Sequence, residues 1–183
     1  MAILQGAVTK NQKEGTHMHF KYCPECGSKL TAKEIGDEGL VPFCEECNRP
    51  LFDMFSCCII AAVVNEYEEA AILRQNYIST KYYNLVSGYM KPGETAEETA
   101  MREVQEEIGV SMESLTFAGT YWFGKKDMLM IGFIGRAKKM ELALSEEVNR
   151  AEWVPVTEAI HMVHPKGSIS YTLLEKYLEG QNP

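Results

Sequence analysis

The stretch Gly88–Val110, GYMKPGETAEETAMREVQEEIGV, decides how the rest of the chain is interpreted. Pro92-Gly93 predicts a tight turn, because proline fixes φ and glycine tolerates a positive φ. Thr95 and Glu98 follow with the spacing of a capping box, and good helix formers then continue to Gly109. Glycine after such a run is typical of a helix end. The stretch therefore predicts a turn followed by a single helix.

The predicted helix has a buried face beside a carboxylate face. At about 100° per residue, one side carries Ala100, Val104 and Ile108, and an adjoining stripe carries Glu103, Glu106 and Glu107. Glu103 and Glu107 are like charges at i,i+4, a spacing that weakens an isolated helix by roughly 0.2–0.5 kcal/mol. Neither has a Lys or Arg three or four positions away. Mg²⁺ or Mn²⁺, which prefer oxygen ligands, would supply the missing positive charge. An ordinary acidic surface helix is the alternative.

Arg102 is the cation of this helix. It lies four residues from both Glu98 and Glu106, so its guanidinium is expected to hold the Glu106 side chain in a fixed orientation.

With these residues identified, the stretch resembles the signature of the Nudix hydrolases, G-x5-E-x7-R-E-U-x-E-E-x-G-U, in which U is a bulky aliphatic residue. The matching positions are Gly88, Glu94, Arg102, Glu103, Val104, Glu106, Glu107, Gly109 and Val110. The resemblance implies an α/β fold, the Nudix α/β/α sandwich with a mixed sheet. It also implies Mg²⁺-dependent hydrolysis of a nucleoside diphosphate linked to another group.

Composition agrees with a single full domain plus a small appendage. The chain has 183 residues, of which 45% are hydrophobic and 24% charged, as in ordinary globular proteins. A net charge of -8 argues against general binding to nucleic acid or acidic membranes. No apolar run approaches the roughly 20 residues that span a bilayer, and the N-terminus lacks the order of a signal peptide. We expect a cytoplasmic protein without membrane association.

Two C-x2-C pairs precede the signature. They consist of Cys23, Cys26, Cys44 and Cys47. This spacing fits a structural Zn²⁺ site, in which four thiolates complete a tetrahedron and leave no open position. Two disulfides are the alternative, which a reducing cytoplasm disfavours. Because the segment carries many carboxylates and few basic residues, we expect a scaffold or dimer contact rather than a nucleic-acid surface. Cys57 and Cys58 are expected in the core.

The sequence divides into three segments. Residues 1–20 are expected to be an N-terminal arm, in which His17 and His19 either bind metal or belong to a solvated tail. Residues 21–54 form the small four-Cys zinc ribbon and residues 55–183 the Nudix domain. Within that domain, strands are predicted at 58–64, 70–75, 83–86, 115–121, 128–135 and 150–154, and further helices at 156–163 and 168–179.

Other residues look like the NADH pyrophosphatase subgroup of this family: the preceding ribbon, Ser87-Gly88-Tyr89, Trp122 before a Met-rich strand, and Pro165–Ile169. This likeness implies a homodimer, base stacking on Tyr89 and Trp122, and substrate contacts from Gly88 and Ser168. Core packing is the alternative for both aromatic residues. The subgroup's S-Q-P-W marker keeps only Trp122 in register, so the choice of dinucleotide stays open.

A further carboxylate is expected outside the signature. Family members place an acidic residue shortly before an A-x-W strand, and Glu147 lies four residues ahead of Ala151-Glu152-Trp153. Glu146 is the alternative position, and a surface salt bridge is the alternative role. The expected metal ligands are Glu103, Glu106, Glu107 and Glu147, with Glu147 or a signature carboxylate accepting a proton from the attacking water.

Three functions fit the sequence. The first is hydrolysis of an NAD(H)-type dinucleotide to AMP and a second mononucleotide. The second is the same reaction on ADP-ribose, FAD or an NAD-capped RNA end. The third is a nucleotide sensor or zinc-ribbon interaction module without catalysis.

Overall fold

The computed structural model describes residues 20–180, and the chain forms two compact units that divide between Met54 and Phe55. The expectation for His17 and His19 therefore lies outside the described residues. None of the helices over residues 20–180 is long and apolar enough to cross a membrane.

The first unit is a small antiparallel sheet. Its elements are β1 (Thr31–Glu34), η1 (Gly36–Glu38), β2 (Leu40–Cys44) and β3 (Arg49–Pro50). β2 pairs with both neighbours. The hydrophobic cluster beneath these short strands consists of Cys23, Leu30, Cys44 and Leu51, so two of its four members belong to the cysteine pairs. A unit with so little apolar core needs another source of stability, which a bound metal can provide.

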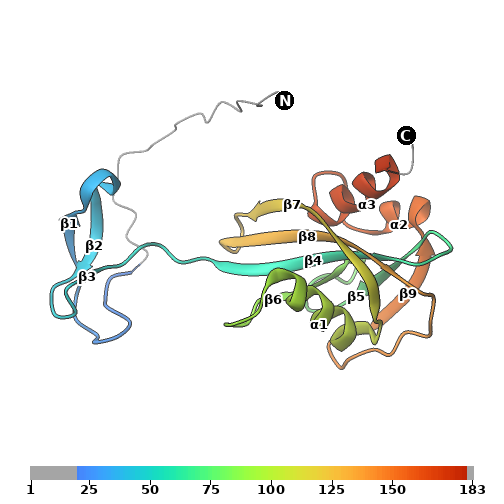
Figure 1. The fold of residues 1–183 in the computed structure, drawn as a ribbon, viewed down its shortest axis with the longest axis horizontal. Coiled ribbons are helices and arrows are strands. Elements are labelled where there is room, and N and C mark those ends of the chain that lie inside the picture. The colour runs from blue at the N-terminus through green and yellow to red at the C-terminus, as the bar shows by residue number, and fades with distance from the viewer. Residues whose placement is uncertain (1–19, 181–183) are drawn as a thin grey trace. The chain divides into compact units, whose positions relative to one another are not determined.

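The second unit is built on a mixed sheet (Figure 1). Its strands are β4 (Ser56–Val64), β5 (Glu69–Arg74), β6 (Val86–Tyr89), β7 (Met112–Phe123), β8 (Met128–Ala137) and β9 (Arg150–Pro155). The strand order is β7-β8-β4-β5-β9, and β6 pairs with β4. β4 and β8 run parallel, whereas the other pairs are antiparallel.

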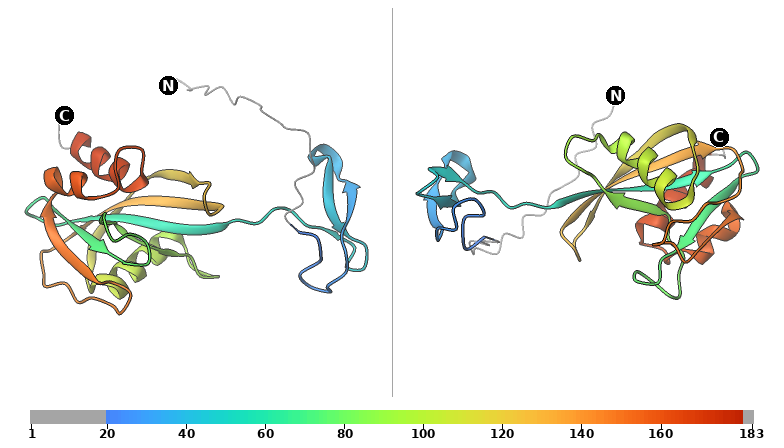
Figure 2. Two further views of the ribbon diagram at one scale, coloured as in Figure 1. Left: turned by 180° about the vertical axis from the view of Figure 1, so that it is seen from behind. Right: turned by 90° about the horizontal axis from the view of Figure 1, so that it is seen from below.

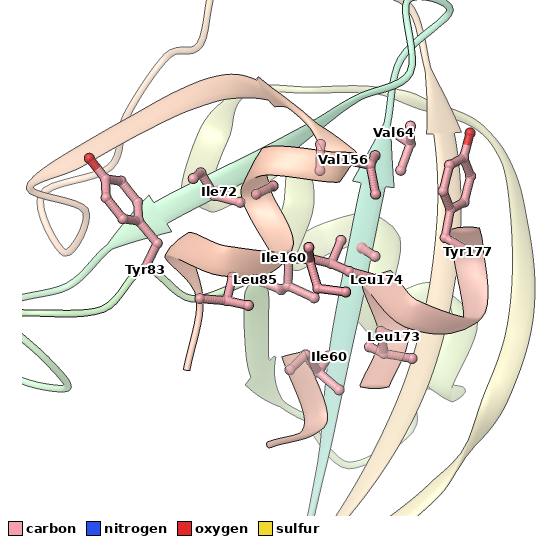
Figure 3. Packing of buried hydrophobic residues seen from close by; sticks show 14 of the residues in the cluster. Ile60, Val64, Ile72, Tyr83, Leu85, Val156, Ile160, Leu173, Leu174 and Tyr177 are labelled. Atoms are coloured by element: carbon pink, nitrogen blue, oxygen red, sulfur yellow. The ribbon is translucent and has the colours of Figure 1, made fainter. Parts of the chain in front are cut away.

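Helices cover both faces of this sheet (Figures 1 and 2). They are α1 (Ala96–Ile108), α2 (Val156–Met162) and α3 (Ile169–Gly180). The apolar run of β4 explains the arrangement, because alternate residues of a strand point to opposite faces and both faces are covered. Ile59, Ala61 and Val63 pack in the cluster of α1. Ile60, Ala62 and Val64 pack with α2 and α3 (Figure 3). The expected α/β/α sandwich is confirmed.

Several strand ends differ from the sequence prediction. β6 begins at Val86 rather than at residue 83, because Asn84 pairs with Leu73 while Val86 onward pairs with β4. β7 is longer than predicted and contains two register shifts, which break the alternation that sequence patterns detect. Cys58 is buried as expected, but Cys57 is only half-buried.

Candidate active site

The carboxylates of the candidate site owe their positions to α1, whose register is fixed at both ends. At the start, the Thr95 hydroxyl accepts from the Glu98 backbone N–H and the Glu98 carboxylate accepts from the Thr95 N–H. This is the capping box that the sequence predicts. At the end, Gly109 adopts a left-handed φ of 70°, which glycine allows at little cost. Ala100, Val104 and Ile108 are fully buried, so the adjoining carboxylate stripe is set against the sheet edge.

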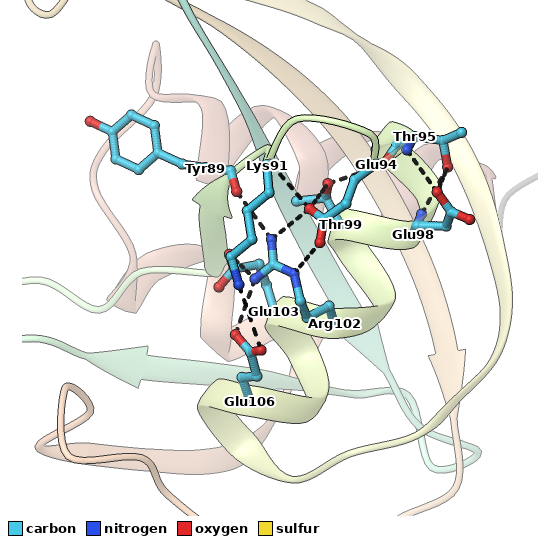
Figure 4. Close-up of polar contacts among 9 residues, drawn as sticks. All are labelled: Tyr89, Lys91, Glu94, Thr95, Glu98, Thr99, Arg102, Glu103 and Glu106. Atoms are coloured by element: carbon cyan, nitrogen blue, oxygen red, sulfur yellow. Dashed lines mark hydrogen bonds and ion pairs between the residues drawn. The ribbon is translucent and has the colours of Figure 1, made fainter.

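Arg102 organises the carboxylates around it (Figure 4). Its guanidinium donates to both oxygens of Glu94, at 2.7 and 2.8 Å, and this pair holds the pKa of Glu94 at about 2. Nη1 also donates to Glu103 at 2.6 Å and to Glu106 at 3.0 Å. The expected Arg102–Glu106 contact is present, whereas Glu98 serves the helix cap instead. Arg102 thus joins the turn before the helix to the carboxylate stripe.

Gly88 makes room for Glu103. A Cβ built at Gly88 would lie 1.9 Å from the Glu103 carboxyl carbon and 2.1 Å from Oε1. Gly88 pairs with Ile59 on the central strand β4, so its backbone cannot move aside easily. The glycine of the signature is therefore required here by a close approach rather than by an unusual φ.

Glu107 is a buried carboxylate with one free oxygen. The residue is 6% exposed, and its Oε1 accepts a 2.9 Å hydrogen bond from Gln75 Nε2. Its Oε2 is buried and has no hydrogen-bond partner among residues 20–180. Burial raises the pKa of Glu107 to about 8, and the nearby charges of Glu103 and Glu147 also raise it. A buried, unpaired carboxylate oxygen beside two other carboxylates is the environment that a cation would stabilise.

These residues line a cavity of about 480 Å³. Its acidic wall consists of Glu103, Glu106, Glu107 and Glu147. The remaining wall combines apolar and aromatic side chains with two lysines, and includes Cys58, Tyr77, Ile78, Tyr89, Lys91, Lys126, Met128 and Met130. A smaller cavity shares the four carboxylates and adds Ser145 and Glu146. The space can therefore receive a ligand that is anionic at one part and planar or apolar at another.

The sequence-predicted substrate residues are not all brought together. Gly88 and Tyr89 line the main cavity, and the Tyr89 ring is 56% exposed. Trp122 is 57% exposed and meets Phe55 edge-on at 5.6 Å between ring centroids, but it does not line the cavity. Ser168 is also outside the lining, because its hydroxyl donates to the His164 carbonyl and accepts from the Tyr171 N–H at the start of α3.

Several lining or supporting residues escaped the sequence analysis, among them two that follow β5 and one lysine. Gln75 and Tyr77 lie in the turn after β5, and Lys126 lies in the turn between β7 and β8. A glutamine ending an apolar strand is a weak signal of a buried hydrogen bond. Two adjacent lysines after Trp122 are an equally weak signal of a phosphate contact. Their roles depend on which loops meet, and sequence spacing does not contain that information.

The four predicted zinc ligands form a cluster of their own. Sγ atoms of Cys23, Cys26, Cys44 and Cys47 all lie within 4.8 Å of one another. Two of these separations are 3.9 Å, between Cys23 and Cys47, and 3.5 Å, between Cys26 and Cys44. A tetrahedron with metal–sulfur bonds of about 2.3 Å has edges of about 3.8 Å, so the cluster fits one metal ion. Hydrogen bonds from Ser28 lower the pKa of Cys26 to about 6, whereas the hydrogen bond with Cys26 raises the pKa of Cys47. Without a bound ion, the thiolate form is therefore favoured at Cys26 and disfavoured at Cys47.

Comparisons with known proteins agree with this geometry. The NAD-capped RNA hydrolase NudC of Haemophilus influenzae (strain PittEE) is 29% identical over 180 residues, which cover 97% of this chain and 66% of that protein. NudC of Pasteurella multocida (strain Pm70) is 30% identical over 182 residues, with the same coverage. The chain thus spans slightly less than two thirds of the length of these relatives.

Solved structures show the same fold. The NUDIX hydrolase from Nitrosomonas europaea superposes with a TM-score of 0.68 at 16% identity, covering 88% of this chain and 92% of that one. The NUDIX domain of Shewanella oneidensis NrtR, complexed with ADP ribose, gives a TM-score of 0.62 at 14% identity and covers 76% and 94%. The family model described as the NUDIX domain matches residues 57–177, which include the whole carboxylate site. The chain therefore belongs to the NUDIX family.

Proposed function

We propose that this protein hydrolyses the diphosphate linkage of an NAD(H)-type dinucleotide, giving AMP and a second mononucleotide. The observation that carries the proposal is the free Oε2 of buried Glu107, which lies beside Glu103 and Glu147 in a cavity that also contains aromatic and cationic side chains. One sequence relative is named NAD-capped RNA hydrolase NudC, and the NUDIX domain of NrtR was solved in complex with ADP ribose, which supports the same class of ligand.

The carboxylate set fits Mg²⁺ or Mn²⁺. Glu103, Glu107 and Glu147 would hold the ion, because all three line one cavity and one buried oxygen of Glu107 has no hydrogen-bond partner among residues 20–180. Glu106 is a more peripheral candidate, since its side chain is 53% exposed and pairs with Arg102 and Lys91. When bound, the divalent cation supplies Lewis-acid polarisation of the diphosphate.

The residues of the chain have the following roles in this proposal. Glu147 accepts a proton from the water that attacks one phosphorus in line with the bridging oxygen, and the phosphoanhydride bond breaks to release two monophosphates. Arg102 keeps Glu103 and Glu106 in place, and its remaining donors bind Glu94 and the Tyr89 carbonyl. Tyr89 stacks on a base within the cavity, and Lys126 offers positive charge to the diphosphate. Stacking by Trp122 and a substrate contact from Ser168 stay predictions.

An NAD-capped RNA end is the second candidate substrate. It is favoured by the relatives named NAD-capped RNA hydrolase NudC, which cover nearly all of this chain. Such a substrate contains the same diphosphate. The net charge of -8 would limit contact to the capped end of the RNA. ADP-ribose and FAD also contain a diphosphate and are further candidate substrates. The complete set of signature carboxylates argues against a nucleotide sensor without catalysis.

The four-Cys unit has a separate proposed role. We propose that Cys23, Cys26, Cys44 and Cys47 bind a structural Zn²⁺ and that the protein is a homodimer, as in the subgroup it resembles. Zinc analysis and light scattering test these two points directly.

The decisive experiment compares NADH, NAD, ADP-ribose, FAD and a short NAD-capped RNA as substrates in the presence of Mg²⁺. The highest kcat/KM is expected for NAD(H) or its RNA-linked form. Glu107→Gln should lower kcat by orders of magnitude and leave the circular dichroism spectrum unchanged. Glu97→Gln, which removes an exposed carboxylate from the first turn of the same helix, is the matched control. Turnover of E107Q at the wild-type rate would refute the site, and absence of turnover on every diphosphate would favour the sensor.

A further inference from the structure

Gln75 is a buried polar residue that the proposed chemistry does not use directly. It follows β5 and is 1% exposed, although glutamine is normally a surface residue. Its side-chain Nε2 donates to Oε1 of Glu107 at 2.9 Å, between positions 32 residues apart. A buried amide in such a place is costly unless its hydrogen bonds are made. The presence of Gln75 beside this carboxylate therefore points to a role for the Gln75–Glu107 hydrogen bond.

The backbone around Gln75 is firmly held. Its carbonyl accepts from the N–H groups of Ile78 and Ser79, at 2.8 and 3.0 Å, which closes the turn after β5. The N–H of the next residue, Asn76, donates to the Asn149 side chain at 2.7 Å, and the Asn149 N–H donates to the carbonyl of Arg74. The turn is therefore tied to the segment that carries Glu147. Gln75 has little freedom to follow Glu107 if that side chain moves.

The hydrogen bond makes the two oxygens of Glu107 different. Oε1 accepts from Gln75, whereas Oε2 is buried and no hydrogen-bond donor of the described part of the chain pairs with it. With Oε1 fixed, rotation of the carboxylate about its last bond is restricted, so Oε2 stays available to the carboxylate wall of the cavity. An amide suits this task because it donates a hydrogen bond without carrying charge. A lysine or arginine at the same place would neutralise Glu107 and compete with a cation.

We propose that Gln75 is a positioning residue that presents Glu107 Oε2 to a divalent cation. The proposal rests on the proposed function in one respect, the assignment of Glu107 as a metal ligand. Loss of a group that orients a metal ligand typically lowers metal affinity about 10–100-fold. We therefore expect a loss of this size when the Gln75 donor is removed. Hydrolysis is not needed to observe this effect, because metal binding can be measured without substrate.

The test uses the full chain with zinc bound and measures the dissociation constant for Mn²⁺ by electron paramagnetic resonance, without nucleotide. Gln75→Met keeps the length of the side chain and removes the donor. We expect the Kd for Mn²⁺ to rise about 10–100-fold. Asn65→Ala is the matched control, because Asn65 is also a fully buried amide with side-chain bonds but lies at the other end of the β4–β5 hairpin. It should lose stability and keep its Mn²⁺ affinity.

A second measurement separates positioning from general structural damage. In the E107Q background, adding Q75M should change the Kd for Mn²⁺ by less than twofold, because the two residues act as one unit. If Q75M does not fold, Gln75→Asn, which keeps an amide but is too short to reach Glu107, carries the same expectation. Unchanged affinity in folded Q75M, or an equal loss in both backgrounds, would overturn the proposal. Affinity that is unaffected by E107Q would overturn the metal assignment as well.

Discussion

The carboxylate of Glu103 fills the space in which a side chain at Gly88 would lie. The separation of 1.9 Å between a hypothetical Gly88 Cβ and the Glu103 carboxyl carbon is far below any permitted contact. Arg102 Nη1 donates to Oε1 of the same carboxylate at 2.6 Å. Glu103 thus contacts the backbone of β6 and the guanidinium of Arg102. The strand β6 contributes to the site because Gly88 has no side chain to occupy this space.

Gly88→Ala should therefore abolish the proposed hydrolysis while the fold is kept. The added methyl group displaces the Glu103 carboxylate, whose side chain can rotate away, so the backbone of β6 need not unfold. We expect kcat to fall about 100-fold or more, since small misplacements of catalytic groups have effects of this size. Gly180→Ala, where a new Cβ meets open space, is the control. An alanine variant with normal turnover would show that Glu103 does not need this position.

Glu107 should make the stability of the protein depend on pH when Mg²⁺ is absent. Its pKa of about 8 in the folded chain exceeds the ordinary value of 4.5, because the buried carboxylate is desolvated. The folded state then retains a proton that the unfolded state has lost between pH 4.5 and 8. The contribution of Glu107 to the free energy of unfolding is fully present below pH 4.5 and is lost as the pH rises to about 8.

Urea unfolding of zinc-loaded wild type and E107Q in Mg²⁺-free buffer measures this effect. The free energy of unfolding of E107Q, minus that of the wild type, should increase by about 2–4 kcal/mol from pH 4.5 to 8. Mg²⁺ should reduce the difference by stabilising the ionised wild-type site. A difference that is constant with pH would mean that Glu107 ionises freely in the folded protein.

The sequence predicts those parts of this site that depend on local signals. The capping box, the helix end at Gly109 and the apolar run of β4 are each encoded within a few residues, and the structure has them at the predicted places. The main partner of Arg102 was not predicted. Glu94 is eight residues away and lies before the helix, so a search at helical spacing finds Glu106 and overlooks it.

The roles of Gln75 and Tyr77 depend on tertiary structure alone. Gln75 reaches Glu107 only because the turn after β5 is brought beside α1, and Tyr77 lines the cavity from the same turn. Tyr77 is 70% exposed, but partial desolvation of its hydroxyl and the charges of Glu147 and Glu107 raise its pKa. The end of a short strand, where such turns begin, is also what sequence patterns locate least well, as β6 illustrates.

Lys126 should affect substrate binding more than the chemical step. It lines the main cavity, whereas the neighbouring Lys125 does not. Arg102 is committed to carboxylates, so Lys126 is a cation that the cavity can offer to a diphosphate. We expect Lys126→Ala to raise KM about fivefold to tenfold with a small change in kcat, because the charge stabilises the bound substrate and the transition state alike.

Lys125→Ala is the matched control for this prediction, since it removes the same charge from the same turn. Steady-state kinetics with NADH at two salt concentrations would also show a weaker salt dependence of KM in K126A than in the wild type. Equal effects of the two substitutions would indicate only a general attraction by the turn.

Loss of the cysteine cluster should unfold the first unit and leave the second folded. Cys44 is fully buried and serves both as a cluster member and as part of the small core of residues 20–54. Cys44→Ser removes a thiolate, so zinc should fall from one ion per chain to near zero, and the segment should become sensitive to protease because little apolar surface remains to hold it. Residues 55–180 have their own two hydrophobic clusters and should keep a cooperative thermal transition.

Cys57→Ser, which changes a half-buried thiol outside the cluster, should retain zinc. Mass spectrometry for metal content and limited proteolysis distinguish these outcomes, and a C44S protein that keeps its zinc and resists protease would show that the four sulfurs do not depend on a shared ion.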